Sequence, residues 1–218
     1  TETLVLERYK LADRITPRCP YVGQCGGCPW QMIDYPAQLR YKHDAVARAL
    51  DGIVEAAMIP EVLPSPDVFY YRNRMDYTFG ANGELGLKAS DQWWNVLDLS
   101  TCFLLSPEAV ELMARVRAWM HAHAIVPWNN QRHSGFLRYL VIREGKRTNE
   151  RMAFLITSPG DLPERDDLIA RLRDYATSII WGVNPAITYI SVARDLHVLH
   201  GSEDLHEELR IPALRTNA

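Results

Sequence analysis

Three of the four cysteines in this 218-residue chain fall within ten residues, in the segment CPYVGQCGGCPW. They are Cys19, Cys25 and Cys28, and the fourth, Cys102, lies far along the chain. A loop rich in glycine and proline makes a poor core segment, so burial of these thiols as small hydrophobic groups is disfavoured. Disulfides are disfavoured too, because we expect a cytosolic protein with a sufficient core of its own. The spacing therefore favours a metal site.

Two kinds of metal site use cysteines in this way. Structural zinc often takes two Cys-x2-Cys pairs, whereas this chain contains one such pair. An iron–sulfur cluster commonly takes three thiolates from one loop and a fourth from a distant segment. Gly26 and Gly27 would let the loop turn tightly and point backbone N–H groups at cluster sulfurs. The pattern favours a [4Fe–4S] cluster, and zinc stays open as the alternative.

The elements that must position these cysteines follow from hydrophobic periodicity and turn signals. We expect helices over 34–50, from 106 onward and over 161–175. Short strands are predicted at 70–79, 84–88, 93–97, 136–143, 152–157, 178–183, 187–192 and 196–200, with Asn82-Gly83 as a hairpin turn.

The grouping of these strands predicts an α+β fold. We expect mainly antiparallel sheets, a few helices and a Cys-rich iron–sulfur loop. No strand–glycine-rich loop–helix unit is recognised, so no Rossmann-like domain is predicted. The expected organisation is a lead-in strand and linker (1–18), an iron–sulfur subdomain with a β-meander (19–105), an RNA-facing α+β subdomain (106–210) and a short tail (211–218).

Several segments resemble one enzyme family. CPYVGQCGGCPWQMIDYPAQLRYKHDAV resembles the iron–sulfur signature of the RNA (uracil-5-)-methyltransferases, which methylate C5 of a uridine in ribosomal or transfer RNA. YYRNRMDYTFG, LGLKASDQWWNVLDLSTCFLLSP and GFLRYLVIRE extend the resemblance over nearly the whole chain. In that family the four matching cysteines bind [4Fe–4S]. The resemblance thus implies a cluster on Cys19, Cys25, Cys28 and Cys102.

The resemblance also implies what this chain contributes. Uracil-5 methylation needs a nucleophilic thiolate, S-adenosylmethionine and a base. The chain has no donor-binding motif and no fifth cysteine, so we predict no catalytic residue and place S-adenosylmethionine only in a missing catalytic domain. The predicted function is the central [4Fe–4S] RNA-recognition domain of such an enzyme, with a structural cluster. The parent protein would be a methyltransferase, and activity of this chain alone is left open.

Two rival functions come from other classes. One is a small electron-transfer iron–sulfur protein, and the other is a zinc-stabilised interaction module. Metal and sulfide content separates the zinc module from the other two, and reversible reduction at an exposed cluster would favour electron transfer.

The expected partner is RNA, as a loop of ribosomal or transfer RNA, and rRNA processing is one expected role. The net charge of −3 argues weakly against this, although residues 132–151 carry six basic and two acidic side chains. For Tyr70, Trp93 and Trp94 we expect core packing, with base stacking as the alternative. The candidate phosphate contacts are Arg40, Lys42, Arg72, Arg74, Arg138 and Arg143; for each, a structural salt bridge is the competing role.

Localisation and assembly are inferred from composition. The N-terminal residues lack the pattern of a secretion signal, and no apolar run approaches the length of a membrane span. We therefore expect a cytoplasmic monomer with no membrane association.

Overall fold

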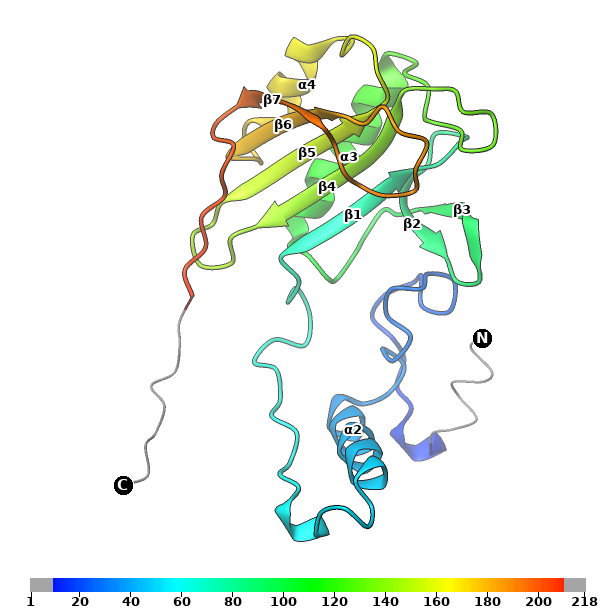
Figure 1. Ribbon diagram of the computed structural model, residues 1–218, viewed down its shortest axis with the longest axis vertical. Coiled ribbons are helices and arrows are strands. Elements are labelled where there is room, and N and C mark those ends of the chain that lie inside the picture. The colour runs from blue at the N-terminus through cyan, green and yellow to red at the C-terminus, as the bar shows by residue number, and fades with distance from the viewer. Residues whose placement is uncertain (1–9, 210–218) are drawn as a thin grey trace.

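One seven-stranded mixed sheet organises the chain in the computed structural model, which describes residues 10–209 (Figure 1). The strand order is β3-β2-β1-β4-β5-β6-β7. The part of the predicted lead-in strand before residue 10 and the predicted tail at 211–218 lie outside the described residues. The strands are β1 (Arg74–Phe79), β2 (Leu85–Ala89), β3 (Gln92–Asp98), β4 (Leu137–Glu144), β5 (Arg151–Thr157), β6 (Ser178–Val183) and β7 (Asp195–His200).

Helices cover one face of this sheet (Figure 1). Helix α3 (Pro107–Ala122) and the short helix α4 (Arg165–Leu172) supply buried apolar residues to the same core as the strands. Tyr77 of β1, Leu140 of β4 and Trp119 of α3 are completely buried there. Successive residues of a strand point to opposite faces of the sheet. The neighbours of Tyr77 in β1 and of Leu140 in β4 are therefore directed to the other face.

The other face is only partly covered. A small buried cluster of Tyr139, Val141 and Ile156 lies there, and Ala193 of the connection between β6 and β7 packs against it. That connection crosses in front of the sheet toward β1 (Figure 1). Gly182 permits this close approach, since a Cβ there would lie 2.5 Å from Ala193. The remaining surface of this face is free to form a site.

The cysteine loop and helix α2 (Tyr35–Ala49) stand beside the sheet (Figure 1). They have a small core of their own, formed by Met32, Ile33 and Ala37. Short 3-10 turns at Leu11–Asp13 and Ala56–Met58 flank this part of the chain. The predicted helix over 34–50 is thus confirmed.

The predicted fold class is wrong in two respects. The strands on both sides of residue 105 form one mixed sheet rather than several sheets, although most of its strand pairs are antiparallel as expected. In addition, β5 and β6 are parallel, with α4 in the connection between them. A strand–helix–strand crossover of this kind is the building unit of Rossmann-like folds. The prediction that the chain has no Rossmann-like domain is therefore also wrong. The parallel pairing is possible because the connection between residues 157 and 178 is long enough to bring the chain back to the end of the sheet where β5 begins.

One predicted strand is absent from the described residues. The apolar run at 187–192 lies in an irregular connection, where the carbonyl of Thr188 accepts from Arg138 and no residue belongs to a strand. The meander, the helix after residue 106, the strands flanking 145–149, and the strands at 178–183 and 196–200 are confirmed to within a few residues.

A buried ion network ties the start of α3 to the end of β4. Ser106 caps the helix by accepting from the N–H of Ala109 at 3.2 Å, and its hydroxyl donates to Glu144. Lys146 and Arg151 also bond Glu144, which is only 4% exposed. Burial would raise the pKa of Glu144, but the hydrogen bonds from Lys146 and Ser106 and the charge of Lys146 outweigh it and hold the pKa below its usual value.

Glu144→Gln should destabilise the fold by about 2–3 kcal/mol at pH 7, because it leaves buried charges uncompensated. Since the folded-state pKa is lowered, the carboxylate stabilises above its unfolded pKa of about 4.3, and this contribution is lost as pH falls through the folded pKa. Urea unfolding at pH 7 and pH 3 should therefore show a difference that shrinks in acid. The control is Glu111→Gln, which breaks an exposed ion pair on α3 and should cost under about 1 kcal/mol. An equal loss at both pH values would contradict the assignment.

Candidate functional site

The structure brings all four cysteines to one small pocket. Cys19, Cys25, Cys28 and Cys102 line it together, with mostly apolar neighbours. Local contacts hold the loop in place: the N–H of Cys19 donates to Gln31 at 2.6 Å, and Cys25 forms an isolated β-bridge with Ala89 of β2. The predicted convergence of a short loop with a distant cysteine is therefore present in the fold.

The electrostatics of the pocket disfavour thiolates unless a cation joins them. Burial raises the pKa of Cys19 and Cys25 and raises that of Cys28 to about 11, and charge on the neighbouring thiolates adds to each shift. The N–H of Gly27 donates to Cys25 Sγ at 3.4 Å and partly offsets the effect there. Because the thiolate forms repel one another and are poorly solvated, the four free cysteines would lose their protons to solvent most readily when a metal binds the sulfurs.

Tyr77 offers a further test of whether a metal group fits. Its hydroxyl is buried and makes no hydrogen bond of normal geometry, although Cys102 lies nearby. Burial is the main cause that raises the pKa of Tyr77, and the neighbouring Cys102 raises it further. A metal-bound thiolate at Cys102 would give this orphaned donor an acceptor. The residues present therefore fit a thiolate-held group.

The spacing of the thiols bears on which metal group fits. Among residues 10–209, no three or more His, Cys, Asp or Glu side chains gather closely enough to hold a metal ion. A tetrahedral zinc ion would need thiolates about 3.8 Å apart, from Zn–S bonds of about 2.3 Å. A four-iron cluster binds each thiolate to a different iron and so accepts wider spacing.

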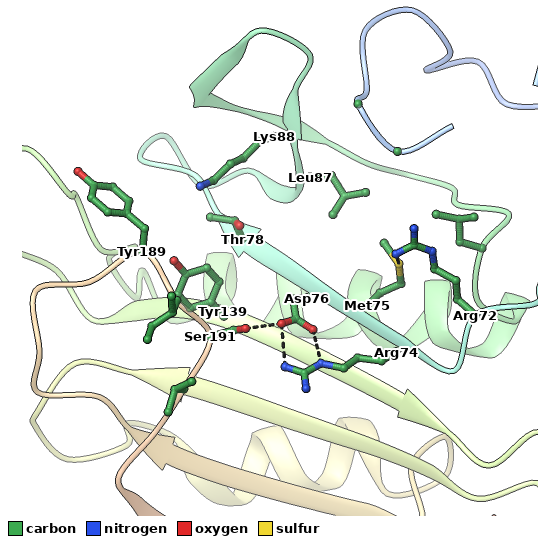
Figure 2. Close-up of a pocket in the computed structure, with 15 residues that line it drawn as sticks. Arg72, Arg74, Met75, Asp76, Thr78, Leu87, Lys88, Tyr139, Tyr189 and Ser191 are labelled. Atoms are coloured by element: carbon green, nitrogen blue, oxygen red, sulfur yellow. Dashed lines mark hydrogen bonds and ion pairs between the residues drawn. The ribbon is translucent and has the colours of Figure 1, made fainter. Parts of the chain in front are cut away.

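A groove on the open face of the sheet begins beside the cysteine loop. It has a volume of about 550 Å³ and runs from Gly26 and Gly27 across β1 to the β6–β7 connection (Figure 2). Its charged lining is three cations and one carboxylate: Arg72, Arg74, Lys88 and Asp76. The two arginines predicted to share a face thus do line one surface.

Asp76 organises the middle of the groove. Arg74 donates to it through two nitrogens at 2.7 and 2.9 Å, and the Ser191 hydroxyl also bonds it (Figure 2). Burial would raise the pKa of Asp76, but the hydrogen bonds from Arg74 and Ser191, with the charges of Arg74 and Arg143, hold it below its usual value. The salt bridge considered as the alternative role of Arg74 is therefore present within β1. The Ser191 hydrogen bond to Asp76 ties the β6–β7 connection to β1.

The other predicted phosphate contacts are spread over the molecule. Arg40 pairs with Asp13 at 2.8 Å, and Lys42 lines a different groove beside α2. Arg143 is exposed and pairs in register with Arg74, so the two lie on the same face. Arg138 is 3% exposed, and its guanidinium donates to the carbonyls of residues 184, 186 and 188 at 2.9, 2.7 and 2.6 Å.

Several groove residues were not identified from the sequence. Lys88, Tyr139, Tyr189 and Ser191 line it, but each sits in a segment that reads as an ordinary strand. The only sign of them in the sequence is that a polar or aromatic side chain stands at every second position of a predicted strand. The approach of the β6–β7 connection to β1 depends on contacts that no local pattern encodes.

Trp93 and Trp94 do not pack in the core as expected. They are 56% and 62% exposed, because β3 is an edge strand and its register with β2 is interrupted between Gln92 and Val96. Tyr70 is partly buried, with its ring centroid 6.1 Å from that of Phe103.

Known proteins similar to this chain are RNA methyltransferases. It is 35% identical to an uncharacterised RNA methyltransferase of Nanoarchaeum equitans, over 88% of this chain and 41% of that protein. It is also 35% identical to a tRNA (uracil(54)-C(5))-methyltransferase of Pyrococcus horikoshii, over 90% of this chain and 45% of the relative. No family model matches the chain.

A solved structure supports the same relationship. The crystal structure of Pyrococcus abyssi tRNA (uracil-54, C5)-methyltransferase in complex with S-adenosyl-L-homocysteine aligns with a TM-score of 0.69 and 31% identity. The match covers 88% of this chain and 44% of that one. Sequence and fold together support membership of the RNA (uracil-5-)-methyltransferase family. The chain spans less than half the length of these relatives.

These comparisons correct the function expected from the sequence. The chain was predicted to be a central RNA-recognition domain from which the catalytic domain is absent. Its matches are to methyltransferases, one of them in complex with S-adenosyl-L-homocysteine, so that description is contradicted. The same match contradicts the exclusion of a Rossmann-like domain. Within residues 10–209, no helix is both long and apolar enough to cross a membrane.

Arg138→Gln should lower stability by about 2–4 kcal/mol, because it strands buried backbone carbonyls that the guanidinium now satisfies. Hydrogen exchange should increase chiefly in residues 184–191, which the guanidinium holds over the sheet. The control is Arg132→Gln, an exposed residue of the same basic segment, which should change stability by less than about 0.5 kcal/mol. Unchanged exchange in 184–191 would show that the connection is held by other contacts.

Proposed function

We propose that this chain is part of an S-adenosylmethionine-dependent RNA (uracil-5-)-methyltransferase that acts on a uridine of transfer RNA. The observation that carries the proposal is its 34–35% identity to three Pyrococcus or Nanoarchaeum methyltransferases over 88–90% of its length. Two Pyrococcus proteins among these are tRNA (uracil(54)-C(5))-methyltransferases. S-adenosylmethionine supplies the methyl group when bound, and we assign no residue of this chain to it.

The open-face groove is the proposed RNA-binding surface. Phosphate contacts require cations that are not already neutralised. Within residues 10–209, the only hydrogen bond of the Arg72 side chain is to the sulfur of Met75, at 3.9 Å, and Lys88 faces the ring of Tyr189, at 5.7 Å. Neither forms an ion pair there, whereas Arg74 is committed to Asp76. Arg72 and Lys88, with exposed Arg143, are therefore the phosphate contacts we retain.

The four cysteines are the proposed ligands of a [4Fe–4S] cluster. Their shared pocket and the buried Tyr77 hydroxyl beside Cys102 support it. Methyl transfer to uracil C5 involves no change of oxidation state, so the proposed role is structural. The ligands would fasten the loop over 19–28 to Cys102 at the end of the meander, and so fix one end of the RNA groove.

Anaerobically purified protein should contain about four irons and four sulfides per chain, as a cubane requires. Cys102→Ala should abolish both, since it removes the one ligand outside the loop. Tyr77→Phe should leave the stability of the metal-free chain unchanged within about 0.5 kcal/mol but shorten the lifetime of the cluster in air. One zinc per chain without sulfide would remove the cluster from the proposal.

Arg72→Gln should weaken tRNA binding and lower the slope of log K against log salt by about 1, the change expected for one lost phosphate contact. Filter binding from 50 to 300 mM salt measures it on an unmodified tRNA transcript. Arg173→Gln, an exposed arginine after α4, is the matched control and should change neither affinity nor slope. Iron content is measured in both variants, because the charge of Arg72 also acts on Cys28. The activity itself is tested by methyl transfer to uridine in the natural protein that contains this chain.

A further inference from the structure

Three exposed aromatic rings from distant parts of the sequence meet beside the groove. The ring of Trp93 packs edge-to-face against Trp94, with centroids 5.8 Å apart, and against Tyr189, with centroids 5.4 Å apart. We propose that Trp93, Trp94 and Tyr189 form a stacking site for unpaired RNA bases, whose phosphates lie along the groove. The inference rests on the proposed function and deepens it.

The exposure of these rings is the first support. Trp93, Trp94 and Tyr189 are 56%, 62% and 49% exposed, although each could bury a large apolar area. The edge-to-face contacts orient the rings without hiding them, so ring faces remain available. Aromatic rings held open in this way are what single-stranded nucleic acids use for stacking, because every base presents a flat π face.

The second support is continuity with positive charge. Tyr189 and Lys88 line the groove directly, and Figure 2 shows both at the end away from Arg72. Lys88 Nζ lies 5.7 Å from the Tyr189 ring centroid, so a cation stands at the junction of the groove and the aromatic site. A site that alternates cations with rings suits a phosphate backbone with splayed bases better than it suits an apolar protein segment.

The third support is that both segments are held in place. Trp93 and Trp94 belong to β3, and the residues on either side of this stretch, Gln92 and Val96, pair with β2. Tyr189 is anchored on both sides. The carbonyl of Thr188, just before it, accepts from Arg138, and the hydroxyl of Ser191, shortly after it, bonds Asp76. The rings are thus presented by an ordered framework, which reduces the entropy lost when bases stack on them.

The test is the affinity of the chain for a fluorescently labelled, unmodified tRNA transcript, measured by anisotropy at fixed salt. Trp94→Ala and Tyr189→Ala should each weaken binding by about fivefold or more, the lower end of the range for loss of a stacked base. Tyr189→Phe keeps the ring and should restore affinity to within about twofold. The slope of affinity against salt should stay unchanged in all three, because no phosphate contact is removed.

Ile187→Ala is the control, since Ile187 is 61% exposed on the same connection but has no ring. It should bind RNA like the unmodified chain. If it weakens binding as much as Tyr189→Ala, the surface is a general apolar docking site and the stacking proposal is wrong. If the alanine variants bind normally while the unmodified chain binds RNA in a salt-dependent way, stacking is again wrong but the proposed function stands. If the unmodified chain binds no RNA, both fail.

Discussion

A buried arginine, which has no carboxylate partner within residues 10–209, sets the shape of the open face of the sheet. Arg138 donates to three carbonyls of the β6–β7 connection, and its guanidinium lies 5.0 Å from the ring centroid of Trp128. Burial lowers the pKa of this arginine, so the carbonyl dipoles and the ring must offset the cost of the buried charge. In return, an irregular segment is held firmly against a sheet. Without that segment, the groove would lose the wall that carries Tyr189 and Ser191.

Charge on this molecule is organised locally, which explains how a chain of net charge −3 can present a cationic groove. The acidic segment near the end of the described residues lies against the basic turn after β4: Glu207 accepts from the backbone N–H groups of Lys146 and Arg147, and Glu150 bonds His206. The turn that dominates the basic run at 132–151 is thereby partly neutralised. Of the cations left to the groove, Arg72 comes from the segment before β1 and Lys88 from β2, where the sequence shows no run of charge, and only Arg143 of β4 belongs to the basic run.

Local chemistry was predictable from the sequence, and the approach of distant segments was not. The cysteine spacing, the Asn82-Gly83 turn and the Ser106 cap follow from short-range rules, and each is where those rules place it. Trp93 and Trp94 were expected in the core because they are apolar, but hydropathy does not show whether a strand lies at the edge of a sheet or in its middle. The run at 187–192 alternates like a strand, but it lies in an irregular connection in which Arg138 bonds the carbonyl of Thr188. The parallel pairing of β5 and β6 was missed because grouped strands suggested hairpins.

The cysteine loop and the β2–β3 hairpin share backbone contacts as well as proximity. Cys25 bridges Ala89, and the N–H of Ser90 donates to the carbonyl of Gln24 at 2.7 Å. The turn that leads into Trp93 and Trp94 is therefore hydrogen-bonded to the loop that carries Cys19, Cys25 and Cys28. Segments joined by such bonds open together, as one cooperative unit. Loss of order in the loop would be transmitted to the tryptophans, so their intrinsic fluorescence should report the state of the cysteines.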